Sequence, residues 1–182
     1  MVGRSHALLA AAAYLALAQH PLGRVAAPRL SVPGSDLDLE PLSLAAGCAL
    51  VVVGGLAPDL DTPRSTLARL GRLPLRLASW LIRLTVGHRG PLHSLVAAAV
   101  VWQLGDALGR PVHLAGLGDV LAFGWLVHVL LDAWTRHGVP LFWPLRAQVR
   151  LPPGFTTGGR LEGPFLFAGL VACAWWASPI AP

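Results

Sequence analysis

The stretch Leu114–Trp134, LAGLGDVLAFGWLVHVLLDAW, decides which class of fold this sequence can form. It is mostly apolar and meets the length of about 20 residues that a helix needs to cross a bilayer. Three ionisable residues interrupt it, namely Asp119, His128 and Asp132. Ionisable side chains are costly inside a membrane and usually serve a function there. The stretch therefore predicts a membrane helix that carries chemically important groups.

Four further apolar stretches accompany this one. They are Ala7–Ala18, Leu42–Ala57, Leu92–Leu108 and Pro164–Ile180. We therefore predict an all-α fold, a polytopic membrane bundle of four to five apolar helices that forms a single domain over residues 1–182. The first stretch is short, so three alternatives stay open for it. It spans, it re-enters the membrane, or it is the apolar core of a cleaved signal peptide.

The composition excludes several classes of protein. Apolar residues make up 54% of the 182 residues and charged residues only 13%, against roughly 25% charged residues in an average soluble domain. With two cysteines, a disulfide scaffold is excluded, and the hydrophobicity excludes disorder. The sequence has no Gly-x-Ser-x-Gly elbow, Walker loop or dinucleotide fingerprint. Serine hydrolases, NTPases and Rossmann enzymes therefore lack support.

The positive charges predict an orientation in the membrane. The net charge is +5, and the sequence contains arginine but no lysine. If all five stretches span with the N-terminus inside, eleven arginines fall on the cytoplasmic side and three outside. The eleven are Arg4, Arg64, Arg69, Arg72, Arg76, Arg83, Arg89, Arg136, Arg146, Arg150 and Arg160. This bias is the positive-inside pattern, so the charge needs no nucleic-acid partner to explain it.

One inner segment has the pattern of an amphipathic helix. Four of its arginines, Arg69, Arg72, Arg76 and Arg83, recur at helical spacing, with leucines and Trp80 between them. We expect this helix to lie on the inner membrane surface. Two interpretations remain open, since both need the same pattern. The charged face is either solvated or in contact with anionic lipid headgroups.

The predicted topology places many ionisable residues at one membrane face. Surface residues without a common role are expected on both faces, so their convergence suggests a shared site. The residues at the cytoplasmic face are His6, Asp59, Asp61, His88, Arg89, His93, His128, Asp132 and Glu162.

The spacing of these residues suits a metal ion. His128 and Asp132 are four residues apart on a predicted helix, so both side chains can reach one ion. Asp59 and Asp61 lie between two prolines, which favours an extended turn with both carboxylates on one side.

The segment from His88 to His93 places two imidazoles around a Gly-Pro bend before a helix. Ser94 and the following backbone N–H groups can help to hold an anion there. Mixed histidine and carboxylate ligands suit zinc, manganese or iron, with zinc or manganese favoured, and the number of candidates allows one or two ions. The candidate ligands are His6, Asp59, Asp61, His88, His93, His128 and Asp132.

These motifs, in this order, are also characteristic of a known family. They are Ser5-His6, Pro58-Asp-Leu-Asp61, His88-Arg-Gly-Pro-Leu-His-Ser-Leu95, His128-Val-Leu-Leu-Asp-Ala-Trp-Thr135 and Gly138-Val-Pro-Leu-Phe-Trp-Pro144. Together they resemble the YdjM-like family of inner-membrane-associated metal-dependent hydrolases. The position before the second histidine of the His-Arg-Gly motif departs from the expected hydroxyl residue, since it is Leu92. The resemblance implies a multi-pass protein of the bacterial inner membrane.

The leading hypothesis is a membrane-bound metal-dependent hydrolase. Arg89 stabilises negative charge on the substrate, and Glu162, Asp59 or Asp61 acts as a base outside the metal's ligands. A site at headgroup level favours an amphiphilic substrate, such as a lipid or another phosphoester, and membrane lipids as partners. Two alternatives stay open. One is an ion- or proton-coupled transporter, and the other is a non-catalytic adaptor with a structural metal.

Overall fold

The computed structural model of the chain describes residues 3–19, 29–30, 40–86, 90–145 and 147–178, and its fold is all-α. The α-helices are α1 (Gly3–Gln19), α2 (Glu40–Leu56), α3 (Thr66–Leu70), α4 (Arg72–Val86), α5 (Leu95–Gly109), α6 (Leu117–Ala133) and α7 (Glu162–Trp176). Three 3-10 helices accompany them, namely η1 (Pro58–Asp61), η2 (Pro91–His93) and η3 (Arg110–Val112). Two short strands, β1 (Arg29–Leu30) and β2 (Leu114–Ala115), pair in antiparallel orientation.

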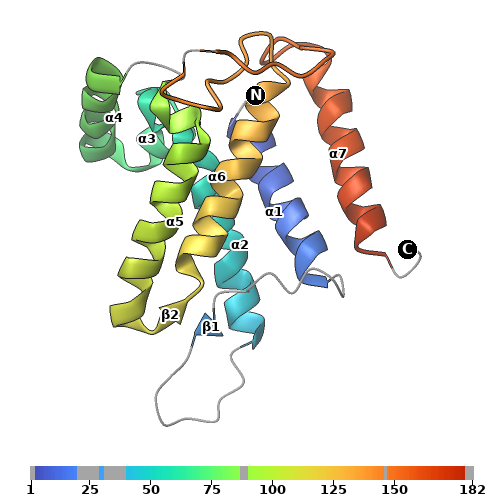
Figure 1. Cartoon of the computed structure of the whole chain (residues 1–182). Coiled ribbons are helices and arrows are strands. Elements are labelled where there is room, and N and C mark those ends of the chain that lie inside the picture. The colour runs from blue at the N-terminus through green and yellow to red at the C-terminus, as the bar shows by residue number, and fades with distance from the viewer. Residues whose placement is uncertain (1–2, 20–28, 31–39, 87–89, 146, 179–182) are drawn as a thin grey trace.

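The five long helices of the bundle arise from the five apolar stretches of the sequence. Helices α1, α2, α5, α6 and α7 lie side by side and alternate in direction (Figure 1). Helix α6 packs against α1, α2 and α5, and α7 packs against α1. Because directions alternate, the start of α1, the end of α2, the start of α5 and the end of α6 lie at the same end of the bundle.

Glycines allow α6 to approach its neighbours closely. A Cβ atom on Gly124 of α6 would clash with the carbonyl oxygen of Val51 in α2, and one on Gly54 would clash with that of Leu121. At the other end of α6, a Cβ on Gly118 would clash with the carbonyl oxygen of Trp102 in α5. Small residues at helix crossings are typical of packing inside membranes.

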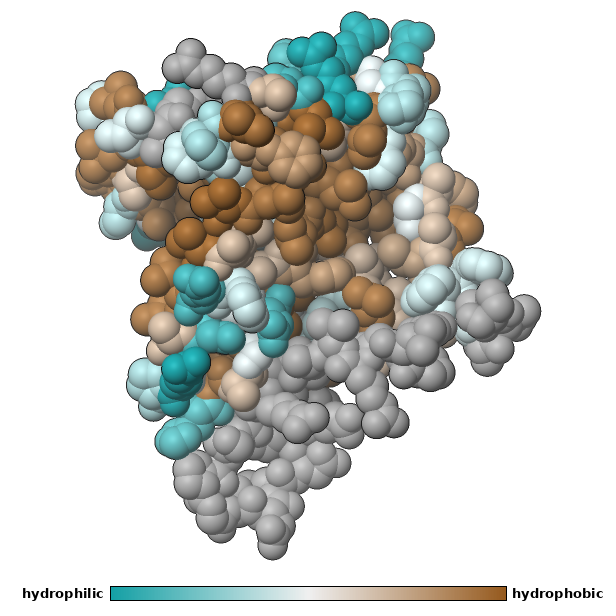
Figure 2. Space-filling model, in the orientation of Figure 1, coloured by the Kyte–Doolittle hydropathy of each residue, from teal (hydrophilic) through white to brown (hydrophobic). Residues whose placement is uncertain are grey.

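One helical segment among the described residues, Leu44–Asp61, is long and apolar enough to cross a bilayer. The five long helices have 15 to 17 residues each, which gives a length of about 25 Å against a hydrocarbon core of about 30 Å. The five-span topology therefore stays a prediction. Figure 2 shows hydrophobic residues gathered across the middle of one face, with hydrophilic residues at the top and lower left.

Helix α1 is packed into the bundle. Ala10 and Tyr14 are buried and belong to one hydrophobic cluster with Val51 of α2 and Val120 of α6. Helix α1 therefore forms part of the hydrophobic core of the bundle.

The predicted amphipathic helix is broken in two. Helix α3 ends at Leu70, and α4 starts at Arg72, whose φ of 53° lies in the left-handed region. Gly71 separates the two helices, so Arg69 lies on α3 and does not share a face with the arginines of α4. Glycine disfavours helix continuation because it has the largest backbone freedom to lose. Pro74 lies in the first turn of α4, where a helix tolerates proline.

Candidate metal centre

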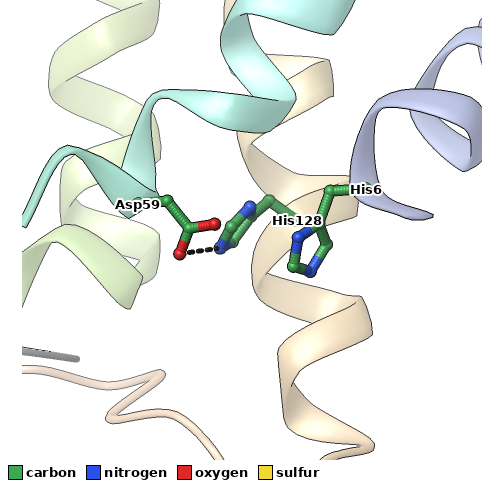
Figure 3. A group of neighbouring side chains, drawn as sticks. All are labelled: His6, Asp59 and His128. Carbon is green, nitrogen blue, oxygen red and sulfur yellow. Dashed lines mark ion pairs between the residues drawn. The ribbon is translucent and has the colours of Figure 1, made fainter. Parts of the chain in front are cut away.

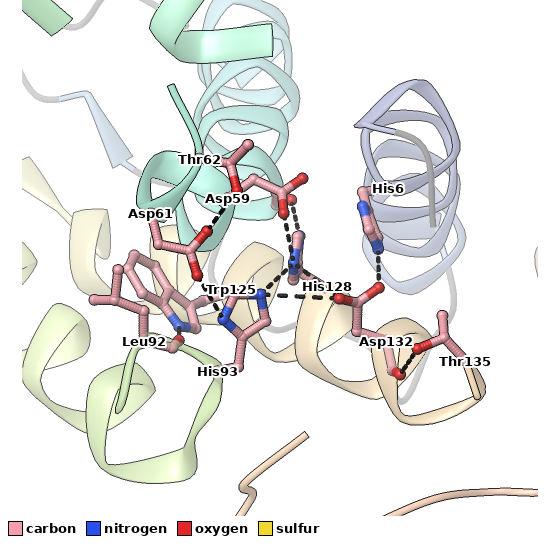
Figure 4. A network of polar contacts seen from close by, with 11 residues as sticks. His6, Asp59, Asp61, Thr62, Leu92, His93, Trp125, His128, Asp132 and Thr135 are labelled. Carbon is pink, nitrogen blue, oxygen red and sulfur yellow. Dashed lines mark hydrogen bonds and ion pairs between the residues drawn. The ribbon is translucent and has the colours of Figure 1, made fainter. Parts of the chain in front are cut away.

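Six of the seven predicted ligands lie together at one end of the bundle (Figure 4). They come from α1, η1, η2 and α6, which are separated in sequence but adjacent in the fold. The six are His6, Asp59, Asp61, His93, His128 and Asp132. His88 and Arg89 lie outside the described residues.

Helix α6 supplies His128 and Asp132 from successive turns. The Nδ1 atom of His128 lies 2.7 Å from the carbonyl oxygen of Gly55 in α2, so Nδ1 carries the proton and donates it. The Nε2 atom of His128 therefore presents a lone pair. A histidine that ligates a metal usually donates its other ring N–H in this way, which fixes its tautomer and its orientation.

Three atoms that can ligate a metal converge beside this lone pair. The Nε2 atoms of His128 and His93 are 3.3 Å apart, and Oδ2 of Asp132 lies 3.8 Å from His93 and 3.9 Å from His128. A circle through the three atoms has a radius of about 2.1 Å, so an ion in their plane would lie at zinc–nitrogen and zinc–oxygen bond lengths of about 2.0–2.2 Å. Because two imidazole lone pairs repel each other, either a proton or a cation lies between His128 and His93. The three atoms therefore fit a transition-metal ion.

The carboxylates of η1 do not lie in the extended turn that the two prolines predicted. Residues 58–61 form a 3-10 helix, with Pro58 at its start. Residues two apart in such a helix point in different directions, since one turn takes about three residues. Asp61 Oδ2 lies 3.6 Å from Nδ1 of His93, whereas Asp59 Oδ1 lies 3.8 Å from Nε2 of His128. Asp61 is thus placed to orient His93 from behind, and Asp59 to face the site.

His6 joins the cluster from α1. Its ring stacks on that of His128 at a centroid distance of 3.9 Å, and its Nε2 lies 3.2 Å from Oδ1 of Asp132. A second group of possible ligands results, formed by His6, Asp59 and His128 (Figure 3). This group shares Nε2 of His128 with the first one. Since one imidazole nitrogen binds one ion, the two groups are alternatives for His128.

The cluster is buried, and among its described residues only Asp59 is partly exposed. The side chains of His6, His93 and His128 are fully buried, and Asp132 is nearly so. Asp59 is 23% exposed. Asp59 is therefore the member of the cluster that solvent reaches.

The supporting contacts fix η2 beside α6. Trp125 Nε1 donates a hydrogen bond of 2.8 Å to the carbonyl oxygen of Leu92, directly before His93. Ser94 caps α5, since its hydroxyl accepts a hydrogen bond from the Ala97 N–H and donates one to Pro91. The Ser94 hydroxyl, which the sequence suggested for holding an anion, is thus used in capping the helix.

Glu162 lies at the start of α7 and is buried. Its Oε1 accepts a 2.7 Å hydrogen bond from the Ser5 hydroxyl, and its Oε2 accepts a 2.6 Å bond from the Gly158 N–H. These bonds tie α7 and the preceding loop to the residue before His6. The geometry thus gives Glu162 a positioning role, and its role as a base stays a prediction.

Sequence reasoning missed three contributors to the site. Gly55 acts through its backbone carbonyl, which leaves no side-chain signal. Trp125 lies within an apolar stretch, and its hydrogen bond to the Leu92 carbonyl has no signal in the sequence. Ser5 was visible as the neighbour of His6, but its link to Glu162 joins residues 157 positions apart.

Known proteins resemble this chain along most of its length. The YdjM inner membrane protein of Escherichia coli (strain K12) is 39% identical over 126 residues, which cover 66% of this chain and 61% of that protein. The Shigella flexneri YdjM protein gives the same values. The YvsG protein of Bacillus subtilis (strain 168) is 30% identical over 131 residues, which cover 72% of this chain and 75% of YvsG.

No solved structure matches the chain at a significant level. The aligned region spans about three fifths of the YdjM proteins of E. coli and S. flexneri, at 61% of their length. The sequence pattern of one protein family, described as YdjM inner membrane protein, matches residues 1–181. The chain therefore belongs to the YdjM family of inner membrane proteins.

Proposed function

We propose that the cluster is the centre of a membrane-bound metal-dependent hydrolase that holds a divalent transition metal. One observation carries the proposal. Nε2 of His93, Nε2 of His128 and Oδ2 of Asp132 surround a point at bonding distance, while the Gly55 carbonyl fixes the His128 tautomer. Two imidazoles and a carboxylate suit zinc or manganese. Three protein ligands leave a position open, as in catalytic zinc sites.

A bound ion of this kind supplies a water molecule whose pKa is near 7, together with Lewis acidity. The residues of the chain then divide the remaining work. Asp59, at the exposed edge, accepts a proton from an incoming water molecule. Asp61 orients His93, and His6 holds the second oxygen of Asp132. Arg89, adjacent to His88 in sequence, is the proposed partner of negative charge on the substrate.

The substrate class follows from the location of the cluster. The cluster lies at one end of a bundle from an inner membrane family, so an amphiphilic molecule can reach it from the headgroup region. A phosphoester carries the negative charge that an arginine binds well. We therefore infer a lipid or another phosphoester as the substrate.

The metal content of the purified protein tests the proposal. We expect a near-stoichiometric transition metal in detergent-purified protein, measured by mass spectrometry without chelators, and its loss in His128→Ala. The matched control is His113→Ala, which removes an exposed histidine at the other end of the bundle. This control should keep the metal.

Two results would overturn the proposal. One is the absence of bound metal after reconstitution with zinc or manganese, which would favour a polar network for transport or scaffolding. The other is a stoichiometric metal without hydrolysis of any lipid or phosphodiester substrate in a screen, which would favour a structural metal in an adaptor.

A further inference from the structure

Helix α4 presents a large surface outside the bundle. In the described part of the chain it packs against α3 and η1. Its inner side contains Ser79, which is fully buried, and Ala78 and Ile82, which are half-buried. Residues 72–77, 80, 81 and 83–85 of the helix are exposed.

The outward side carries an apolar stripe. On a helical wheel the stripe covers about 100°, given 3.6 residues per turn. Exposed fractions of these side chains range from 53% to 67%. The residues of the stripe are Leu73, Leu77, Trp80, Leu81 and Leu84. Soluble proteins rarely expose such a contiguous apolar surface unless it binds something.

A row of arginines runs beside the stripe. Arg72, Arg76 and Arg83 are exposed and lie within about 40° of one another on the wheel. The sequence has no aspartate or glutamate from Thr62 to Gly105, a segment with six arginines. The positive charge of α4 therefore has no acidic counterpart within its own segment.

We propose that this face of α4, the stripe together with the arginine row, docks on anionic phospholipids of the membrane that houses the bundle. The stripe enters the boundary between headgroups and acyl chains, and the arginines bind lipid phosphates. This division of apolar and basic residues is the pattern of helices that lie in the membrane interface. Each arginine near an anionic surface strengthens binding substantially.

The position of α4 links this surface to the metal cluster. Helix α4 packs against η1, which carries Asp59, the partly exposed residue of the cluster. The helix that binds the lipid thus packs, by its inner side, against the element that carries Asp59. The docking surface does not depend on the metal. The further consequence, that the substrate is an anionic phospholipid, rests on the proposed function.

Fluorescence of Trp80 tests the apolar half of the proposal. The full chain is placed in phosphatidylcholine nanodiscs that contain either brominated phosphatidylglycerol or brominated phosphatidylcholine. The signal of Trp80 is the difference between the native chain and Trp80→Phe. We expect stronger quenching by the brominated anionic lipid. Equal quenching by both lipids would overturn the anionic preference.

Quenching of Trp80 by aqueous iodide, without quenching by brominated lipid, would overturn the proposal that the stripe enters the membrane. It would show that the stripe is outside the bilayer and favour a protein partner or a solvated face. Neither fluorescence readout involves a metal, so failure here is distinct from failure of the hydrolase proposal.

Lipid titration followed by native mass spectrometry tests the arginines. The variant Arg72→Gln/Arg76→Gln/Arg83→Gln is compared with Arg136→Gln/Arg150→Gln/Arg160→Gln, which removes the same charge from exposed positions outside α4. We expect phosphatidylglycerol to bind the α4 variant at least about tenfold more weakly, and the control nearly as well as the native chain. Equal losses in both variants would mean a general charge effect and would overturn a specific surface on α4.

Discussion

The carboxylates at the two ends of the helix bundle have different contacts. At the end with β2, Asp106 accepts a 3.2 Å hydrogen bond from the Gly118 N–H, and Asp119 accepts one of 2.9 Å from Trp102 Nε1. At the other end, Asp132 lies within 4 Å of three imidazoles. A carboxylate in an apolar helix is therefore not by itself a sign of a site. Several ligand atoms that face one point are the sign.

This difference bears on the transport alternative. A transporter needs polar groups along a path across the bilayer. Asp106 and Asp119 lie towards the end of the bundle with β2, and each is engaged in packing α5 against α6. The geometry thus favours a site at one end over a path between the ends.

The largest expected effect comes from Asp132→Asn. Its oxygens contact His6, His93 and His128, so the substitution removes a negatively charged ligand and disturbs both possible groups. We expect metal affinity to fall by more than the roughly 10- to 100-fold that loss of an outer partner causes. Competition with a fluorescent chelator measures the affinity.

The matched control for this prediction is Asp106→Asn. The amide oxygen can still accept the hydrogen bond from Gly118, so we expect unchanged metal affinity and nearly unchanged stability. Similar losses of metal affinity in the two variants would contradict the distinction between the two ends.

The next effect in size belongs to Asp61→Asn. Asp61 faces Nδ1 of His93, on the side of the ring opposite the proposed ion. We expect metal affinity to fall by about 10- to 100-fold, while saturating metal still gives full stoichiometry. The same chelator competition measures this. If stoichiometry is lost as well, Asp61 is a ligand of the metal.

Substitutions at two glycines of α6 can distinguish an effect on helix packing from an effect on metal binding. In Gly124→Ala the new Cβ would clash with the Val51 carbonyl and would lie 2.8 Å from the Gly55 nitrogen, next to the carbonyl that holds His128. In Gly118→Ala it would clash with the Trp102 carbonyl at the other end. We expect both to lower the free energy of unfolding by about 1–3 kcal/mol. Only Gly124→Ala should also weaken metal binding.

Thermal unfolding in detergent and chelator competition, measured on the same preparations, check this prediction. Loss of metal affinity in Gly118→Ala would mean that the cluster senses any disturbance of α6. Full affinity in Gly124→Ala would mean that the Gly55 carbonyl is not needed to orient His128.

Much of the site could be predicted, because it depends on patterns within short segments of the sequence. Periodic apolar stretches predicted the long helices, and alternating direction placed His6, His93, His128 and Asp132 at one end. The direction of the two η1 carboxylates could not be predicted, since the prolines are compatible with both an extended turn and a 3-10 helix.

Other features depend on contacts between distant segments. The Gly55 carbonyl reaches His128 only because α2 and α6 cross at glycines, and a carbonyl has no sequence signature. The partner of Glu162 is Ser5, far away in sequence, so its buried carboxylate looked free to act as a base. The break at Gly71 was hidden by an arginine pattern that continues across it. Tertiary contacts thus set the roles that residue types left open.

The smallest expected effect compares two tryptophans at opposite ends. Trp102→Phe removes the hydrogen bond to Asp119 from a side chain that is 46% exposed, and Trp125→Phe removes the bond to Leu92 from one that is 7% exposed. Each loss costs about 0.5–1.5 kcal/mol of stability, with the buried bond at the upper end.

We expect the affinity for the metal to differ between these two variants. Leu92 precedes His93, so Trp125→Phe loosens η2 and should weaken metal binding a few-fold in the chelator competition, whereas Trp102→Phe should leave it unchanged. If neither variant changes metal affinity, the bond between the Leu95 N–H and the Leu141 carbonyl is sufficient to hold the start of α5. If only Trp102→Phe changes it, the two ends are coupled through α6, and the carboxylates of the far end belong to the site after all.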